Sequence, residues 1–472
     1  MKVLIIGAGI GGLACAIACQ QEGFEVVILE RADRIVPIGA GIQIPPNGAR
    51  VARQLGYMNK LLKCGVVLDA IEFRRYANGK TLHTFLSKDS QSRYGELWMV
   101  IHRADFHAVL WQKCEELGVS LCLNKGVERI DFNNNVVHLE DGGDIQGDVI
   151  VGADGKNRSN LLLKHVIEEL RLTPIGLHSV CRNQLLGSPS PAVETGDLAY
   201  RAVFPAEYLK ALEDPRVDEL CARKQVTAWF GPDRHTVFYP VKGGREFNLV
   251  LVRPDNMQPN EKRIEGDIEE MRESYAGWDK TRQPSLRHNE KCPIMIVTQR
   301  LTLFRLTKLI SLIPKVLKWK LCTHPELTTW TKGSFALLGD SCHPSLPYQA
   351  QGAAMAVEDG AVLGKLLGLL KGSAGDNIKQ KIPEILELYE SLRKSRTTVN
   401  VAGALSNRKW YHVEDGPEQE ARDAELGGVP LKEGLSPTGW RWVDKNYQMD
   451  LLGRDSVAEA VEAFKQWDHK QA

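Results

Sequence analysis

The segment KVLIIGAGIGGLACAIACQQEGFEVVILE, residues 2–30, decides the expected fold. It opens with an apolar strand that ends in Gly7-Ala-Gly9-Ile-Gly-Gly12, a G-x-G-x-x-G pattern. The first glycine permits a tight turn, the second lets the backbone approach a pyrophosphate, and the third lets the following helix pack against the strand. This order of strand, glycine turn and helix predicts a dinucleotide-binding α/β unit.

The rest of the segment adds the second strand and the acid that such a unit needs. An Ala/Cys-rich helix is expected to residue 21, and an apolar strand over residues 25–29 ends at Glu30. A carboxylate at that strand end is placed to bind a ribose diol. The alternative is a glycine-rich turn in an ordinary α/β unit, but the two strands and Glu30 favour nucleotide binding.

A second segment, GDSCHPSLPYQAQG (residues 339–352), predicts another part of a binding site. The apolar run 334–338 leads into it, and a small-residue helix over residues 353–370 follows. Asp340 offers one carboxylate to a ribose-type hydroxyl. The helix start at Gly352 offers backbone N–H groups to an anionic or electron-rich group.

Composition limits the class of protein. The 472 residues are 43% hydrophobic and 25% charged, with a formal net charge of +1, and the length suits two or three domains. We expect no nucleic-acid partner, because no charge field of one sign is available. No apolar stretch reaches the roughly 18 residues of a membrane span, so no membrane insertion is expected. Ten cysteines without a C-x-x-C pair favour a reduced, cytoplasmic setting, and no His/Asp/Glu cluster has metal-ligand spacing.

Two local patterns leave alternatives open. Cys15 and Cys19 are four residues apart on the first helix, where packing is favoured over metal binding. Residues 309–321, LISLIPKVLKWKL, are amphipathic and basic. This stretch could touch a membrane surface, but a buried helix face with solvated lysines is favoured.

The order of expected elements indicates a nucleotide domain interrupted by a β-rich domain. Residues 1–185 are assigned to the first part of the nucleotide domain, residues 186–300 to a β-rich substrate domain, and residues 301–410 to the second part of the nucleotide domain with its helices. Residues 411–472 are expected to form a peripheral C-terminal tail. A cofactor between a nucleotide fold and a substrate-covering sheet is common in this arrangement.

Over residues 1 to about 411, the chain resembles the single-component (group A) FAD-dependent aromatic hydroxylases, in their salicylate-hydroxylase-like branch. The resemblance is carried by six motifs: the glycine fingerprint with Glu30, GAGIQIPPN (39–47), HRADF (102–106), Asp154-Gly155, GDLAYR (196–201) and the segment 339–360. The last is the most specific, because G-D-x-x-H-P followed by L-P-Y-x-A-Q-G-A-A-M-A is hard to confuse with other flavoproteins. The resemblance implies a Rossmann-like FAD-binding domain of the GR2 type with an inserted β-rich substrate domain and a helical C-terminal region.

The resemblance also implies roles for individual residues. Glu30 would hold the adenosine ribose, Gly41 would lie along the cofactor, and Arg103 would bind the FAD diphosphate. Asp340 would bind the ribityl chain, while Gly352 and Ala353 would direct N–H groups at the pyrimidine edge of the flavin, which becomes negative on reduction. The full set implied for the cofactor is Gly7, Gly9, Gly12, Glu30, Gly41, Arg103, Asp154, Asp340, Gly352 and Ala353.

The family chemistry implied is hydroxylation of a phenolic ring, salicylate-like or polyketide-derived, with NAD(P)H and O2. NAD(P)H would reduce the flavin, and O2 would add to give a C4a-hydroperoxide that attacks the ring. Arg201 stands where the family places a cation near the substrate, and its alternative is a surface or ion-pair arginine. Tyr239 could face the substrate, but a core tyrosine is equally compatible. His343 is expected to be structural rather than catalytic.

The chain departs from the family at D-G-x-x-S-x-x-R, whose Asp and Arg help to hold the pyrophosphate. Asp154-Gly155 is separated from Ser179 and Arg182, and removing residues 156–176 restores the spacing. A second excess lies at residues 280–304. Both segments are interpreted as translated introns in preference to genuine loop insertions, and a message encoding residues 156–176 would exclude that interpretation for the first.

Two other functions remain as alternatives. An FAD-dependent dehydrogenase or oxidase shares the N-terminal fingerprint, but it has no need of the L-P-Y-x-A-Q-G segment. A flavoprotein inactivated by residues 156–176 is the third possibility.

Overall fold

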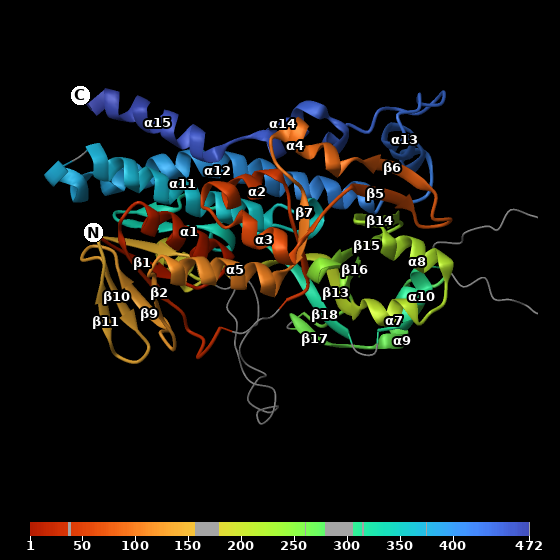
Figure 1. Cartoon of the computed structure of the whole chain (residues 1–472), viewed down its shortest axis with the longest axis horizontal. Coiled ribbons are helices and arrows are strands. Elements are labelled where there is room, and N and C mark those ends of the chain that lie inside the picture. Colours follow the sequence, from red (N-terminus) through yellow and green to blue (C-terminus); the bar gives the residue numbers. More distant parts are fainter. Residues whose placement is uncertain are drawn as a thin grey trace, which may run out of the picture.

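The computed structural model describes residues 1–35, 39–155, 179–259, 261–278, 305–313, 316–373 and 375–471. The two segments interpreted as insertions, residues 156–176 and 280–304, lie outside these ranges. Figure 1 shows a nucleotide domain of strands and long helices beside a second, larger sheet, with helix α15 along one side of the molecule.

The nucleotide domain is built on a six-stranded sheet with the order β19–β20–β12–β1–β2–β8. Every neighbouring pair in it is parallel except β19 and β20. The strands are β1 (Lys2–Ile6), β2 (Glu25–Leu29), β8 (Ser120–Cys122), β12 (Val149–Gly152), β19 (Thr331–Lys332) and β20 (Phe335–Leu337). Their apolar runs are almost wholly buried, as expected for a parallel sheet that is covered on both faces.

The strand register brings three distant turns to one edge of this sheet. Ile6 pairs with Gly152, and Gly152 pairs with Leu337, so β1, β12 and β20 end side by side. The glycine turn, Asp154 and the Gly339-Asp340 step follow these strand ends directly. Ligands of open α/β sheets bind outside the carboxyl ends of the strands, so the register positions a site at this edge.

Helices rich in small residues cover the sheet. Helix α1 (Ile10–Gln21) packs against α11 (Gly352–Ser373) so closely that a Cβ on Gly360 would lie 2.5 Å from the Cys15 nitrogen. Cys15 and Cys19 are fully buried in this contact and act as small packing residues. The long helix α12 (Ile378–Tyr411) and α15 (Ser456–Gln471) lie beside α11, and α5 (Arg103–Glu116) packs on α1 (Figure 1).

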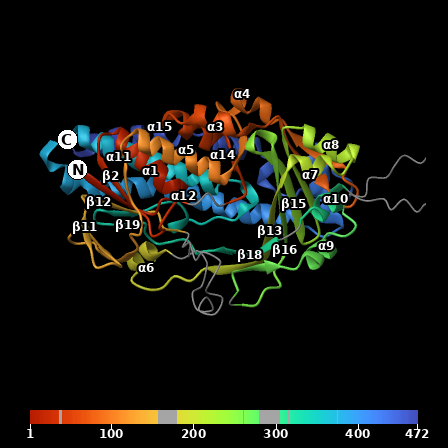
Figure 2. The same cartoon turned by 60° about the horizontal axis from the view of Figure 1, so that its bottom comes forward.

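The second sheet has eight strands in the order β17–β18–β13–β16–β15–β14–β5–β6. Its strands are β5 (Ala70–Arg75), β6 (Thr81–Phe85), β13 (Val193–Pro205), β14 (Gln225–Gly231), β15 (Arg234–Val241), β16 (Glu246–Pro254), β17 (Arg263–Gly266) and β18 (Val316–Thr323). The sheet therefore extends beyond the expected 186–300 domain, because β5, β6 and β18 come from outside that range. Short helices cover one face, namely α7 (Ala206–Lys210), α8 (Pro215–Ala222), α9 (Ile268–Ser274) and α10 (Arg305–Ser311) (Figure 2).

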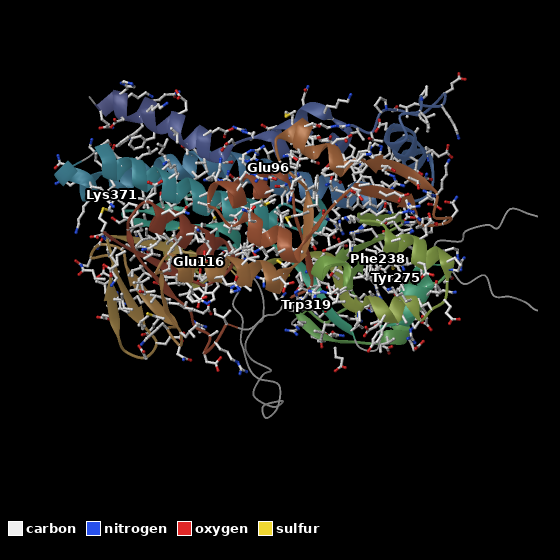
Figure 3. The ribbon with its side chains drawn as sticks, viewed as in Figure 1. Glu96, Glu116, Phe238, Tyr275, Trp319 and Lys371 are labelled. Carbon is white, nitrogen blue, oxygen red and sulfur yellow. The ribbon has the colours of Figure 1, made fainter. Side chains whose placement is uncertain are left out.

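Side chains alternate between the two faces of this sheet. Phe238 and Tyr275 belong to the core beneath the short helices, where each is 1% exposed (Figure 3). Tyr239, one residue along β15, belongs to a different core cluster on the opposite face. Because side chains alternate along a strand, one face of the eight-stranded sheet packs under the short helices, and the other face is available to form a site.

The amphipathic helix favoured for residues 309–321 is wrong. Helix α10 ends at Ser311, and β18 begins at Val316. The alternation of Leu317, Trp319 and Leu321 with lysines is a strand pattern. Lys318 and Lys320 are 5% and 9% exposed and pair with Glu270 and with Glu194 and Asp255, so these lysines are not solvated.

The C-terminal residues pack into the molecule and do not form the expected peripheral tail. Trp440 is 1% exposed and Trp442 is 5% exposed, and both belong to the core cluster that contains Tyr239. Three helices are formed, α13 (Pro417–Leu426), α14 (Lys445–Gly453) and α15. Burial of the indole rings provides a large apolar contact area that holds this segment in place.

The remaining elements connect or flank the two sheets. The strands are β3 (Gly41–Ile44), β4 (Val66–Val67), β7 (Met99–His102), β9 (Val127–Asp131), β10 (Val136–Leu139) and β11 (Asp144–Gln146). The helices are α2 (Pro46–Gln54), α3 (Met58–Cys64), α4 (Ser90–Tyr94) and α6 (Val180–Leu186). Within the described ranges, no helix combines the length and apolarity that crossing a bilayer requires.

Candidate functional site

A cleft of 1420 Å³, its open mouth included, runs from the carboxyl edge of the six-stranded sheet to the open face of the second sheet. Eight of the residues proposed from sequence line it, namely Gly9, Gly41, Arg103, Arg201, Tyr239, Asp340, Gly352 and Ala353. Gly7 and Glu30 follow the adjoining strands β1 and β2, Gly12 lies in the first turn of α1, and Asp154 lies between Ala153 and Gly155, which line the cleft.

The glycine turn has the geometry that the fingerprint requires. Gly7 has φ +108°, in the region that favours glycine, and a Cβ on Gly12 would lie 2.1 Å from the Gly7 carbonyl oxygen. A Cβ on Gly9 would meet nothing within 4 Å. Gly7 and Gly12 are therefore fixed by the fold, whereas Gly9 faces open space in the cleft.

Glu30 lies beside this turn at the end of β2. Its carboxylate accepts hydrogen bonds from the backbone nitrogens of Ala8 at 2.9 Å and Ala32 at 3.0 Å. These bonds hold the carboxylate at the strand end and leave it partly exposed. The position matches that of an acid that binds a ribose diol in dinucleotide folds.

Arg103 and Gly41 border the middle of the cleft. Arg103 is the first residue of α5, and its partly exposed side chain packs on Gly39. Gly41 donates its N–H to the Asn248 amide oxygen at 2.8 Å. A Cβ on Gly41 would lie 2.4 Å from the Tyr239 ring, so this glycine also lets β3 approach β15 of the eight-stranded sheet.

The far end of the cleft is formed by the segment that leads into α11. Gly339 has φ +63° and donates its N–H to the Asp359 carboxylate at 3.0 Å, which fixes the turn that presents Asp340. Gly352 and Ala353 form the first turn of α11 and line the cleft. N–H groups in a first helical turn lack intrahelical partners and favour negative charge.

The interrupted D-G motif is assembled in space. Ser179 donates its hydroxyl to Asp154 at 2.5 Å, and the Cys181 N–H donates to the same carboxylate at 3.1 Å. Arg182, fully buried, donates to the Asp340 and Ser341 carbonyl oxygens at 2.7 and 2.6 Å. Arg182 therefore supports the Gly339–Ser341 turn, and Asp154 holds the start of α6, from which Arg182 extends.

This arrangement predicts the effect of removing residues 156–176. The deletion shortens the connection between Gly155 and Ser179 from 23 residues to two. Closing a shorter loop costs less conformational entropy when the chain folds. We therefore expect the free energy of unfolding to rise by about 2 kcal/mol, with FAD retained. Denaturant unfolding and the bound-flavin absorbance of the purified protein measure both quantities.

The matched control adds Ser179→Ala to the deletion. This substitution removes the hydrogen bond to the partly buried Asp154 and is expected to reverse about 1 kcal/mol of the gain. A deletion variant that loses FAD while the full-length chain keeps it would contradict the prediction.

The open face of the second sheet supplies the substrate side of the cleft. Tyr239 on β15 is 4% exposed, and Arg201 on β13 is exposed. Burial raises the pKa of Tyr239, so its hydroxyl stays protonated. Among the described residues, no hydrogen-bond partner of the Tyr239 hydroxyl is found, which leaves it available to a ligand.

Sequence reasoning missed His235. It lies four residues before Tyr239 on the same face of β15, and both residues line the cleft. Its Nδ1 lies 2.8 Å from Nε2 of His412, and burial lowers its pKa well below 6.5, so the ring is neutral. The period of two along His235, Val237 and Tyr239 was the available signal.

A smaller chamber of 460 Å³, its open mouth included, adjoins the cleft and shares residues such as His235 and Val237 with it. Its walls are mainly apolar and aromatic: Ile71, Phe73, Trp98, Val226, Ala228, Tyr348, Tyr411 and Trp442. Among the described residues that line it, none carries a formal charge. The chamber suits a flat apolar ring.

His343 serves the structure of the turn, as expected. Its Nε2 lies 2.6 Å from Asp359, a fully buried carboxylate that also binds Gly339 and Arg393. Cys342 and His343 with Asp359 lie close enough to hold a metal ion. However, both oxygens of Asp359 are already engaged, one by Arg393 and the other by Gly339 and His343. These three residues therefore hold one another within the protein core.

The residues of the cleft fit FAD. The open space at Gly9 leaves room for a pyrophosphate, the carboxylates of Glu30 and Asp340 can accept hydrogen bonds from hydroxyl groups, and the N-terminus of α11 lines the cleft. The cleft is continuous from Gly9 to Asp340 and Gly352, as an extended dinucleotide requires.

Comparisons with known proteins agree with this geometry. Residues 1–180 match a family model described as an FAD binding domain. The chain is 34% identical to "FAD-dependent monooxygenase OpS4" of Beauveria bassiana, over 98% of this chain and 97% of that protein. It is 30% identical to "3-hydroxybenzoate 6-hydroxylase 1" of Aquipseudomonas alcaligenes, over 97% of this chain and 98% of that protein. A solved salicylate hydroxylase–substrate complex has the same fold, with a TM-score of 0.71, 20% identity and 98% coverage of both chains.

Proposed function

Because this chain belongs to the FAD-dependent monooxygenases, we propose that it hydroxylates a phenolic ring with NAD(P)H as reductant and O2 as oxygen donor. The observation that carries the proposal is the continuity of the cleft. It joins the cofactor end, at Gly9 and Asp340, to a charge-free aromatic chamber behind His235 and Tyr239.

Bound FAD supplies electron transfer and oxygen activation, and the residues of the chain position and protect the reaction. Gly9, Glu30, Arg103 and Asp340 would hold the cofactor along the cleft. The backbone N–H groups of Gly352 and Ala353 would stabilise negative charge at the end of the cofactor nearest the sheet. The buried chamber would exclude water from the reacting ring.

His235 and Tyr239 would orient the phenol and promote loss of its proton. A phenolate ring is a stronger nucleophile than a phenol ring. The neutral His235 imidazole can accept a proton from a substrate hydroxyl, because burial keeps the ring unprotonated near pH 7. The Tyr239 hydroxyl can donate a hydrogen bond to the phenolate oxygen.

Arg201 would act at the cleft mouth. Its guanidinium is exposed and lines the cleft, while the chamber carries no charge. A carboxylate on the substrate would therefore be held toward Arg201, with the ring in the chamber. This placement accounts for the positive charge at the cleft mouth and the absence of charge in the chamber.

The test measures substrate-dependent oxidation of NAD(P)H by the purified flavoprotein, with product identified by mass spectrometry. The panel contains salicylate, 3-hydroxybenzoate, 2,4-dihydroxybenzoate and orcinol. We expect at least one compound to gain an oxygen atom with matching NAD(P)H consumption. Oxidation of NAD(P)H without any oxygenated product would contradict the proposal.

Tyr239→Phe is expected to lower kcat/KM about tenfold, because a hydrogen bond to the reacting oxygen contributes roughly 1–2 kcal/mol. FAD content is expected to stay unchanged, since the ring still packs against Gly41. Tyr208→Phe is the matched control, because Tyr208 is 52% exposed on α7, away from the residues that line the cleft. Steady-state kinetics of both variants decide the role, and equal kcat/KM values would assign Tyr239 to the core alone.

A further inference from the structure

A pair of histidines connects the cleft to the exterior of the protein. His235 on β15 is 3% exposed and lines both the cleft and the chamber. His412 follows the last residue of α12 and is partly exposed. The His235 Nδ1 and the His412 Nε2 lie 2.8 Å apart, within the range of a direct hydrogen bond.

This contact assigns the remaining ring nitrogens. A hydrogen bond between two neutral imidazoles uses one N–H and one acceptor nitrogen. The contact occupies Nδ1 of His235, so Nε2 is the nitrogen left for a ligand in the cleft. In His412 the contact occupies Nε2, so Nδ1 is left for the partly exposed side. The two rings therefore offer one nitrogen to the cleft and one toward solvent.

Charged groups surround the outer ring on several elements. Asp197 from β13, Asp233 before β15, and Arg408 and Arg234 exert opposing effects on His412. Asp197 itself is bound by Arg408 at 2.5 Å and accepts the Tyr348 hydroxyl at 2.5 Å. Both oxygens of Asp197 are therefore engaged by Arg408, and one of them also by Tyr348.

Burial keeps both rings in the neutral form. It lowers the pKa of His412 from 6.5 to about 4, and the pKa of His235 also lies well below 6.5. A histidine is neutral above its pKa, so His412 is neutral from pH 6 upward and His235 is neutral near pH 7. Two neutral imidazole rings joined by a hydrogen bond can pass a proton along while each ring stays neutral, because each ring gains one proton as it loses another.

We propose that His412 is the outer half of a proton relay that carries the phenol proton of the substrate from His235 to solvent. This role rests on the proposed hydroxylase function and assigns a further positioning residue to the same site. The substrate O–H bond breaks as an N–H bond forms at His235 Nε2. The proton on His235 Nδ1 passes to His412 Nε2, and His412 releases the proton on its Nδ1 to water. One proton enters, one leaves, and no electron is transferred.

The test compares the pH dependence of turnover in the holoenzyme and in His412→Asn. Asparagine still accepts the His235 N–H through its amide oxygen, but it cannot pass a proton onward. The substrate is the panel phenol that the unmodified enzyme hydroxylates fastest. We expect the unmodified enzyme to show a flat kcat from pH 6 to 8. The variant is expected to show a kcat lowered at least about tenfold at pH 6.5 that rises with pH as hydroxide replaces the relay. Added imidazole is expected to restore part of the lost rate.

Two controls separate the relay from a structural effect. FAD content and substrate affinity of His412→Asn should equal those of the unmodified enzyme. His138→Asn, which removes a histidine from the β10 hairpin, should leave the pH profile unchanged. A His412→Asn profile identical to that of the unmodified enzyme overturns the relay but leaves hydroxylation intact. Absence of hydroxylation by the unmodified enzyme overturns the proposed function and the relay with it.

Discussion

Gly9→Ala is expected to give a folded protein that binds FAD 10- to 100-fold more weakly. A Cβ at this position meets no protein atom within 4 Å, and the backbone of Gly9, with φ −75°, suits alanine. The added methyl group would instead occupy space that the pyrophosphate needs. Forced overpacking of this kind costs about 1–3 kcal/mol, and isothermal titration of the apoprotein with FAD measures the loss.

Two other glycines serve as controls for this prediction. Gly12→Ala would place a Cβ 2.1 Å from the Gly7 carbonyl oxygen, so we expect loss of soluble, folded protein. Gly372→Ala, in the last turn of α11, meets nothing within 4 Å and should change neither folding nor FAD affinity. A Gly9→Ala protein with unchanged FAD affinity would show that the cofactor does not approach this turn.

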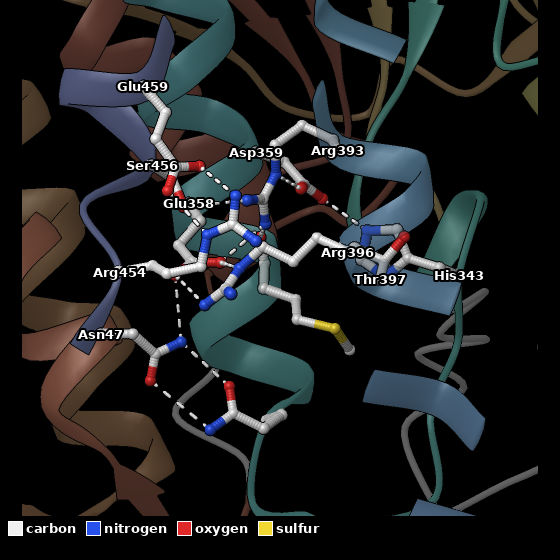
Figure 4. A network of polar contacts seen from close by, with 12 residues as sticks. Asn47, His343, Glu358, Asp359, Arg393, Arg396, Thr397, Arg454, Ser456 and Glu459 are labelled. Carbon is white, nitrogen blue, oxygen red and sulfur yellow. Dashed lines mark hydrogen bonds and ion pairs between the residues drawn. The ribbon is translucent and has the colours of Figure 1, made fainter. Parts of the chain in front are cut away.

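Arg393→Met is expected to destabilise the protein by about 3–5 kcal/mol. Arg393 is 1% exposed on α12 and donates to Asp359 at 2.8 Å and to Glu358 at 2.7 Å, both on α11 (Figure 4). It also donates to the Ser456 hydroxyl at 3.0 Å, which joins α15 to the network. Removing one partner of a buried ion cluster leaves carboxylate charge without adequate compensation. The midpoint of urea unfolding measures the effect.

Arg454→Met is the matched control in the same region. Arg454 pairs with Glu459 and Asp450, but its side chain is 41% exposed (Figure 4). Exposed ion pairs contribute at most about 1 kcal/mol, so this variant should unfold close to the unmodified protein. Equal midpoints for Arg393→Met and Arg454→Met would contradict a stabilising role of the buried cluster.

The same cluster predicts sensitivity to acid. Arg396 and Arg393 lower the pKa of Glu358 to about 2, and His343 and Arg393 lower that of Asp359 to about 2. Carboxylates with lowered pKa values stabilise the folded state above their unfolded pKa and lose that contribution as the pH falls toward 2. The Arg393→Met protein should therefore lose less stability than the unmodified protein over this interval.

The cofactor half of the site could be predicted from sequence because its information is local. Gly7, Glu30 and Asp340 each follow an apolar strand, and parallel strand ends meet at one edge of a sheet. The FAD-dependent family and the two-sheet fold inferred from these motifs are confirmed. The individual roles of the site residues stay predictions, and Gly9→Ala addresses them first.

The substrate half depended on contacts between distant residues. His235 and His412 are 177 positions apart, and no local pattern joins them. Trp442 lines the chamber, although it belongs to a charged, Trp-rich segment that was expected to form a peripheral tail. In β18, a helical period was inferred across Ser311, where the helix in fact ends, and the strand alternation beyond it was missed. Long-range packing overrides local propensity in each of these cases.

The most direct test of the central claim is the source of the oxygen atom in the product. The purified flavoprotein is supplied with NAD(P)H, the active panel phenol and ¹⁸O₂, and the product is weighed by mass spectrometry. The account predicts that one ¹⁸O atom enters each product molecule, with one NAD(P)H consumed. A product that contains no ¹⁸O, whether formed by dehydrogenation or with oxygen from water, would contradict it.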